Sequence, residues 1–96
     1  MLNRKLTPII VGRTVKRVAQ SEGALHIEFD DGSILKIKTG APFTDSIAGR
    51  KVKKALQKGT EFDLEFEDKS KAKIVLAEET SSVMLRNKAG ELEYAD

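Results

Sequence analysis

One stretch of the chain matches another stretch 37 residues downstream without a gap, so that Thr7–Thr39 overlays Thr44–Leu76. The match runs through turns as well as apolar positions, which indicates a duplicated structural unit. Two units are too few for a solenoid, so we expect one domain, residues 1–96, in which each unit covers the apolar face of the other. The identical pairs are Thr7/Thr44, Ile10/Ile47, Gly12/Gly49, Arg13/Arg50, Val15/Val52, Lys16/Lys53, Gln20/Gln57, Glu28/Glu65, Phe29/Phe66, Asp31/Asp68, Ser33/Ser70, Lys36/Lys73 and Ile37/Ile74.

The centre of the first unit predicts a hairpin. Apolar and polar residues alternate from position 25 to 30, which is the pattern of a strand with one buried face, and Asp31-Gly32 is a turn signal. A three-residue loop, Asp30–Gly32, matches apolar residues across the two strands, whereas a two-residue loop sets Ile27 opposite Lys36. Such a loop ends in a left-handed residue, which glycine adopts freely. The expected pairs are Leu25 with Ile37, His26 with Lys36 and Ile27 with Leu35.

The second unit predicts the same register, with Glu67-Asp68-Lys69 as its loop. Lys69 stands where the first unit has Gly32, so we expect the second turn to be more strained. Opposite charges meet across the strands, and such pairs stabilise a sheet modestly. The expected pairs are Phe62 with Ile74, Asp63 with Lys73, Leu64 with Ala72 and Glu65 with Lys71.

The beginning of each unit allows two interpretations. Residues 12–20 are rich in β-branched side chains and favour a strand, whereas Asp45 and Gly59 are placed to cap and stop a helix. A helix would also carry Gly12 and Gly49 in its interior, which is unfavourable. We therefore favour strands, with a short turn of helix at Ile9–Gly12 and Ser46–Gly49. The alternative is an α+β protein of two αββ units plus a hairpin.

The segment 81–96 lies outside the repeat and predicts a third hairpin. A loop at Asn87–Gly90 would pair Leu85 with Leu92, Val83 with Tyr94 and Arg86 with Glu91, leaving Met84 exposed. The expected fold is all-β: two tandem three-stranded units related by a pseudo-twofold axis plus this hairpin, in a small barrel or sandwich. The eight expected strands are Thr14–Gln20, Ala24–Asp30, Ser33–Thr39, Lys51–Gln57, Glu61–Glu67, Ser70–Ala77, Ser81–Asn87 and Glu91–Ala95.

Composition narrows the classes of function. The chain has no cysteine and one histidine, which argues against disulfides, thiol chemistry and a His- or Cys-ligated metal site. It contains no nucleophile elbow, phosphate loop or dinucleotide fingerprint. We therefore expect no catalytic residue, no cofactor and no metal. No apolar run has the length of a membrane span or signal peptide, so we expect a cytoplasmic protein.

Two functions stay open. The first is a non-catalytic accessory or protein-interaction module, which an exposed edge strand would suit and which we expect to form a homodimer through the terminal hairpin. The alternative is nucleic-acid binding, because a basic cluster recurs in both units and two such patches would suit a phosphate backbone. Acidic residues on the neighbouring strands are expected to offset part of this charge. The two clusters are Arg13, Lys16 and Arg17, and Arg50, Lys53 and Lys54.

Overall fold

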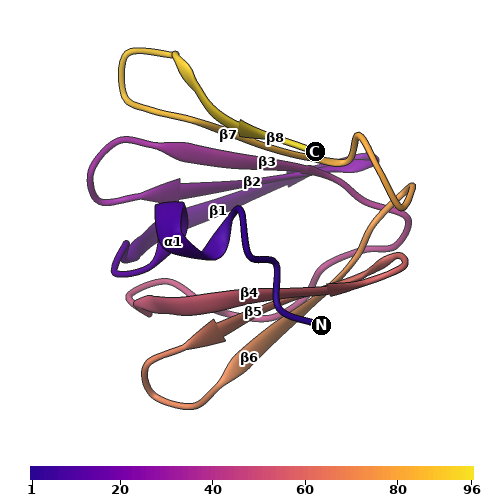
Figure 1. Ribbon diagram of the computed structural model, residues 1–96, viewed down its shortest axis with the longest axis horizontal. Helices are drawn as coiled ribbons and strands as arrows, with labels where there is room; N and C mark the ends of the chain where they lie inside the picture. The colour runs from indigo at the N-terminus through magenta and orange to yellow at the C-terminus, as the bar shows by residue number, and fades with distance from the viewer.

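A computed structural model describes residues 1–96 as eight antiparallel strands and one short helix (Figure 1). The strands form a five-stranded sheet in the order β1-β2-β3-β7-β8 and a three-stranded sheet in the order β4-β5-β6, with no closed barrel. The all-β class is confirmed, and the αββ alternative is wrong because both possible helices are the strands β1 and β4. The elements are α1 (Thr7–Ile10), β1 (Val15–Ser21), β2 (Ala24–Phe29), β3 (Ile34–Lys38), β4 (Val52–Lys58), β5 (Glu61–Phe66), β6 (Lys71–Val75), β7 (Val83–Arg86) and β8 (Leu92–Ala95).

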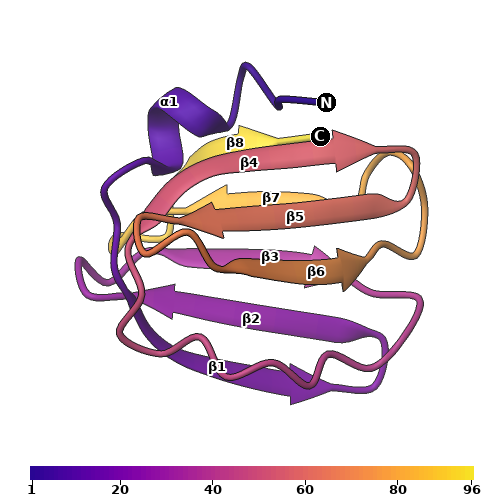
Figure 2. The same cartoon turned by 90° about the horizontal axis from the view of Figure 1, so that it is seen from below.

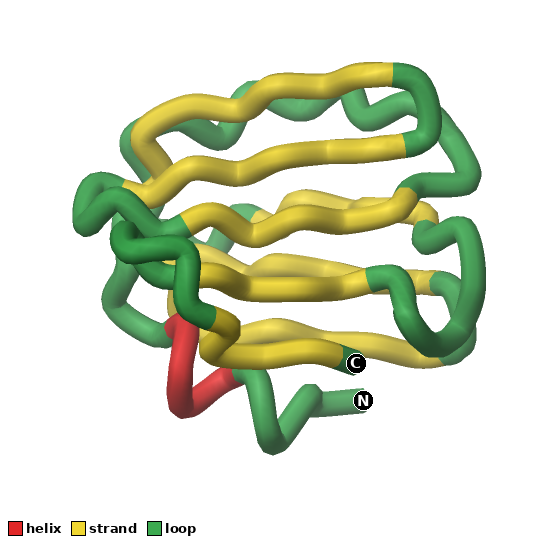
Figure 3. The backbone as a smooth tube through the Cα atoms, turned by 90° about the horizontal axis from the view of Figure 1, so that it is seen from above, coloured by secondary structure: helices red, strands yellow, loops and turns green.

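The two sheets lie in two layers with a shared apolar core between them (Figure 1). The strands of both layers run in similar directions, and the segment 40–50 passes beside β1 (Figure 2). The two termini lie on the same side of the molecule (Figure 3). Three phenylalanines, Phe29, Phe62 and Phe66, are among the largest fully buried side chains. Each sheet therefore supplies part of one core.

The predicted hairpin registers are confirmed in both sheets. Ile27 pairs with Leu35 and His26 with Lys36, and 37 residues later Leu64 pairs with Ala72 and Asp63 with Lys73. The pairing of β1 with β2 likewise recurs in the pairing of β4 with β5, including the irregularity beside the first residue of β1 and of β4. The alternating apolar residues determine these registers, because a shift of one residue would turn every buried side chain toward solvent.

Backbone hydrogen bonds link the two sheets at both ends. At one end Gly12 N donates to Val52 O at 2.8 Å, and Gly49 N donates to Val15 O at 2.7 Å. At the other end Gly40 N donates to Val75 O, and Ala77 N donates to Lys38 O, both at 2.9 Å. Each of these bonds has a reciprocal partner 37 residues away. The two meanders β1-β2-β3 and β4-β5-β6 therefore exchange contacts in a symmetric pattern.

The short helices expected at the start of both units are found only once. The first is α1, which spans Thr7–Ile10 and so begins two residues before the predicted Ile9–Gly12. It contains Pro8 in its first turn and follows a turn in which Asn3 Oδ1 accepts a hydrogen bond from Leu6 N at 2.9 Å. The prediction for Ser46–Gly49 is wrong, because that segment has no helix. Gly40 stands 37 residues after Asn3, and Asp45 stands 37 residues after Pro8. Both of these helix-initiating features are therefore absent from the second segment.

The terminal hairpin forms, but its predicted register is wrong. Leu85 pairs with Tyr94 and Arg86 with Leu92, and the register shifts between these two pairs. This arrangement brings Tyr94 against the core, where its hydroxyl accepts a hydrogen bond from Asn3 Nδ2 at 3.1 Å, and leaves Leu92 52% exposed. Met84, expected to be exposed, is half-buried. Strand β7 joins the hairpin to the first sheet by pairing with β3.

Candidate functional site

The predicted basic residue Arg13 is committed to carboxylates of its own chain. It is 16% exposed, donates two hydrogen bonds to Glu93 at 2.8 and 3.0 Å, and lies 3.6 Å from Asp31. The hydrogen bonds to Glu93 raise the pKa of Arg13, and the same bonds hold the pKa of Glu93 below its ordinary value. This bidentate pair ties the loop before β1 to the terminal hairpin.

The remaining residues of the first basic cluster face Glu28 on the neighbouring strand. Arg17 Nε donates to Glu28 at 2.7 Å, and Lys16 Nζ lies 3.8 Å from the other carboxylate oxygen. The hydrogen bond from Arg17 lowers the pKa of Glu28. Two cations thus share one carboxylate on the outer side of β1 and β2.

The second basic cluster is arranged in a similar way. Lys54 Nζ lies 3.1 Å from Glu65, and this interaction lowers the pKa of that carboxyl. Lys53 also acts on Glu65 through its charge, and Arg50 acts on Asp68. The carbonyl of Arg13 accepts a hydrogen bond from Val52 N, and the carbonyl of Arg50 accepts one from Val15 N. The backbones of the two arginines therefore lie close together where β1 and β4 begin. Both predicted clusters are therefore interleaved with acidic side chains.

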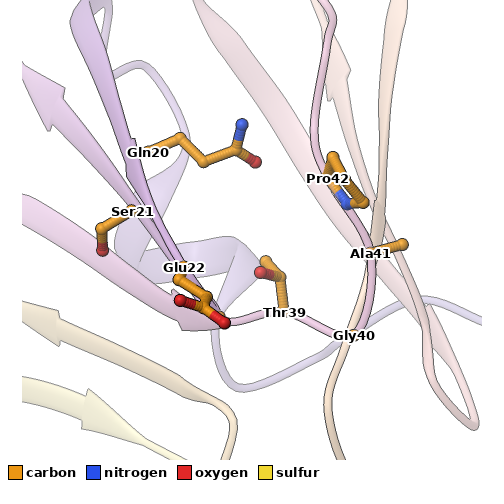
Figure 4. Close-up of a pocket in the computed structure, with 8 residues that line it drawn as sticks. Gln20, Ser21, Glu22, Thr39, Gly40, Ala41 and Pro42 are labelled. Atoms are coloured by element: carbon orange, nitrogen blue, oxygen red, sulfur yellow. The ribbon is translucent and has the colours of Figure 1, made fainter.

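A polar hollow lies between the β1–β2 turn and the segment after β3 (Figure 4). Gln20 extends across this hollow, donating to Phe43 O at 3.1 Å and accepting from Phe43 N at 2.6 Å. Glu22 is its one ionisable side chain. The amide of Gln20 thus holds the linker against β1.

A different set of cations lines a groove on the outer face of the five-stranded sheet. The groove has a volume of about 230 Å³ and crosses β2, β3 and β7 near the β7–β8 loop. Its floor contains Met84 and the 40% exposed Ile34, and none of the residues that line it is acidic. We call this feature the cationic groove, and its main residues are His26, Ile34, Lys36, Met84, Arg86 and Lys88.

Strand pairing and loop contacts position the cations of this groove. His26 lies opposite Lys36, and Lys36 lies opposite Met84, so one row crosses three strands. Arg86 Nη1 donates to Gly90 O at 2.8 Å, which fixes the guanidinium beside the loop. The aliphatic stem of Lys88 covers Gly32 so closely that a Cβ there would meet Lys88 Cγ at 2.9 Å. None of the four basic side chains forms an ion pair within the chain.

The groove could not be predicted from the sequence, because its floor forms only where β3 pairs with the distant strand β7. The pairing of β3 with β7 joins residues about fifty positions apart, whereas each predicted hairpin joins near neighbours. One signal was present: the hairpin register already placed His26 opposite Lys36 on the solvent face. The groove adds Arg86 and Lys88 to that pair.

Comparison with known proteins finds no match among protein-family models, curated proteins or solved structures. The single helix of the structure is too short to cross a membrane.

Proposed function

We propose that the protein is a non-catalytic interaction module that holds an acidic segment of a partner protein in the cationic groove. One observation carries this proposal: three cations without internal carboxylate partners, Lys36, Arg86 and Lys88, line one groove whose floor is apolar. An exposed cation without a carboxylate partner retains its full positive potential at the surface. The potential of the cations beside Glu28 and Glu65 is partly cancelled by those carboxylates. The favoured ligand combines carboxylates for Lys36, Arg86 and Lys88 with apolar groups for the floor.

The surface around the groove favours an extended ligand. A second hollow along β3 and β7 shares Lys36 and Met84 with the groove. It adds Lys38, and the acidic Asp96 also lines it. A peptide lying across β3 and β7 would thus meet the positive charges of Lys36 and Lys38, with its acidic positions placed away from Asp96. We infer that acidic side chains at several positions of one segment contribute to binding.

Nucleic-acid binding stays the alternative, because the same cations suit phosphates as well as carboxylates. The lining of the groove contains no aromatic side chain, whereas aromatic stacking usually holds the bases of single strands. We therefore prefer the acidic peptide as the ligand. If the ligand is a nucleic acid, a duplex bound through its phosphate backbone fits the groove better than a single strand.

Fluorescence anisotropy tests both functions on the intact chain. The probes are a labelled peptide of glutamate and leucine and labelled single- and double-stranded oligonucleotides, each across a salt series. We expect the peptide to bind and the double variant Lys36→Glu with Arg86→Glu to weaken it about tenfold or more, since repulsion replaces attraction. The control is Arg50→Glu with Lys53→Glu, which reverses two charges of the predicted clusters and is expected to leave binding unchanged.

The possible outcomes separate the two functions. Binding of oligonucleotides alone, lost in the Lys36→Glu and Arg86→Glu variant, would replace our proposal with the alternative. Loss of binding in the Arg50→Glu and Lys53→Glu variant instead would move the site to the predicted clusters. If no probe binds at low salt, both functions are wrong.

We also propose that the two meanders are copies of one module and that the protein forms a homodimer through β8. The duplication is supported by the identical registers 37 residues apart. The homodimer is supported by the position of β8 at the outer edge of its sheet and by the exposed Leu92. Sedimentation equilibrium tests the homodimer: Leu92→Lys is expected to give a monomer, and a wild-type monomer at all concentrations contradicts it.

A further inference from the structure

Strand β6 has one side without a hydrogen-bonding partner. It lies at the edge of the three-stranded sheet and pairs only with β5. In antiparallel pairing, backbone groups alternate between the two sides of a strand. Leu76 N donates to Thr60 O toward the β5 side, so the amides of Lys71, Lys73 and Val75 point away from β5. Val75 O is already occupied by Gly40 N, which leaves the free edge between residues 71 and 75.

The other sheet shows what such an edge accepts. Strand β3 occupies the same place in the first meander, and its outer side pairs with β7. In that pair Leu35 and Leu85, both buried, lie opposite each other, and Lys36 lies opposite Met84 on the outer face. Residues 71–75 correspond to β3 one by one at the 37-residue spacing. The edge of β6 is thus the counterpart of an edge that is filled elsewhere in the same molecule.

We propose that β6 accepts an extended segment of a partner protein that alternates apolar and acidic residues, added antiparallel as β7 is added to β3. The buried Ala72 and Ile74 lie on the core side of β6, and the exposed Lys71 and Lys73 lie on its outer side. An added strand therefore places apolar side chains toward the core and carboxylates beside the two lysines. This mode is strand addition, in which backbone bonds give affinity and alternate side chains give specificity.

Charge disfavours a second copy of β6 as the occupant. Val75 O is occupied, so an antiparallel β6–β6 pair has to be centred toward the start of the strand. In the registers that remain, Lys73 of one copy lies opposite Lys71 or Lys73 of the other copy. Like charges directly opposite each other destabilise a strand pair. Lysines on an edge strand are a common protection against self-pairing. The same two lysines attract a strand with carboxylates at these positions, so they select a partner of opposite charge.

Within this chain, β5 shows the expected composition. Its acidic residues Asp63 and Glu65 lie opposite Lys73 and Lys71, with apolar residues between them. A synthetic peptide with the sequence of residues 61–67 is therefore a suitable probe for the other side of β6. The matched control peptide carries lysine in place of each acidic residue and keeps the apolar residues.

The test is amide hydrogen exchange of the intact protein, measured by NMR with and without each peptide. We expect the acidic peptide to slow exchange at Lys71, Lys73 and Val75 about tenfold or more, and the lysine peptide to have no effect. The variant Lys73→Pro removes one outward N–H while keeping the pairing with β5, and it is expected to abolish the effect. The variant Lys71→Gln with Lys73→Gln keeps the backbone and is expected to remove the preference between the peptides.

The proposal is independent of the cationic groove, and the variants keep the two sites apart. Binding that survives Lys36→Glu with Arg86→Glu but fails in Lys73→Pro belongs to β6. Unchanged exchange at Lys71, Lys73 and Val75 with saturating acidic peptide overturns the proposal, as does equal protection by the two peptides in the unmutated protein.

Discussion

The two meanders have the same pairing but different neighbours. The first, β1-β2-β3, continues into β7 and β8, whereas the second, β4-β5-β6, ends at an unpaired edge. In the first meander Arg13 is held by Glu93 of the terminal hairpin, whereas its counterpart Arg50 forms no ion pair. One local sequence pattern thus gives one local structure, and the segments added around it give the two halves different surroundings.

The largest expected effect tests whether the two halves share one core. Phe29 and Phe66 lie 37 residues apart at matching positions of the two meanders, and both are fully buried. Each substitution by alanine is expected to lower the free energy of unfolding by about 3–5 kcal/mol, because it removes buried area and leaves a cavity. Urea unfolding of both variants provides the measurement. A loss below about 1 kcal/mol for one variant alone would break the equivalence of the meanders.

The next effect separates the two arginines. Arg13→Ala leaves Glu93 without its bidentate partner and is expected to cost about 1.5–3 kcal/mol, a typical value for hydrogen bonds to charged groups. Arg50→Ala is the matched control, expected to cost less than about 0.5 kcal/mol because its side chain forms no ion pair. Thermal unfolding compares the two. Equal losses would show that the terminal hairpin does not distinguish the halves.

The two hairpin turns offer a smaller test. Gly32 and Lys69 are both left-handed, with φ of 87° and 73°. Lys69→Gly is expected to stabilise the protein by about 1 kcal/mol, since lysine is strained in this region. Gly32→Ala is expected to destabilise by at least as much, because its Cβ would also meet Lys88. A destabilised Lys69→Gly variant in urea unfolding would contradict this account of the turns.

The smallest expected effect is the change in folding stability with pH. A hydrogen bond from Arg17 lowers the pKa of Glu28, and one from Arg13 lowers the pKa of Glu93. The ion pair with Lys54 lowers the pKa of Glu65. A carboxyl whose pKa is lower in the folded state stabilises that state above its unfolded pKa, and the contribution is lost as pH falls through the folded pKa. Stability should therefore fall below about pH 4.5, near the ordinary pKa of glutamate.

Glu93→Gln provides the matching variant for this dependence. Because glutamine does not titrate, the melting temperature of this variant should fall less steeply between about pH 4.5 and pH 2 than that of the unmutated protein. Glu91→Gln is the control, since Glu91 forms no ion pair, and its profile should match the unmutated one. If the melting temperature of Glu93→Gln falls with pH as steeply as that of the unmutated protein, the Arg13–Glu93 pair does not contribute to the loss of stability in acid.

The comparison also shows which features the sequence could predict. The registers of the two local hairpins followed from alternating apolar residues and from the turn at Gly32, because the pairs lie close in the chain. The pairing of β3 with β7 had no local signal, and so the cationic groove was not found. The register of β8 was missed because apolar matching cannot reveal a shift in the ladder, here one that brings Tyr94 within reach of Asn3.

Native-state hydrogen exchange of the protein without ligand tests the difference between the halves most directly. The comparison sets Lys36 and Lys38, whose strand is paired on both sides, against Lys71 and Lys73, whose outer side is free. We predict slow exchange at the first two amides and fast exchange, close to that of an unpaired peptide, at the second two. Equal protection of all four would contradict the account, because β6 would then already have a partner.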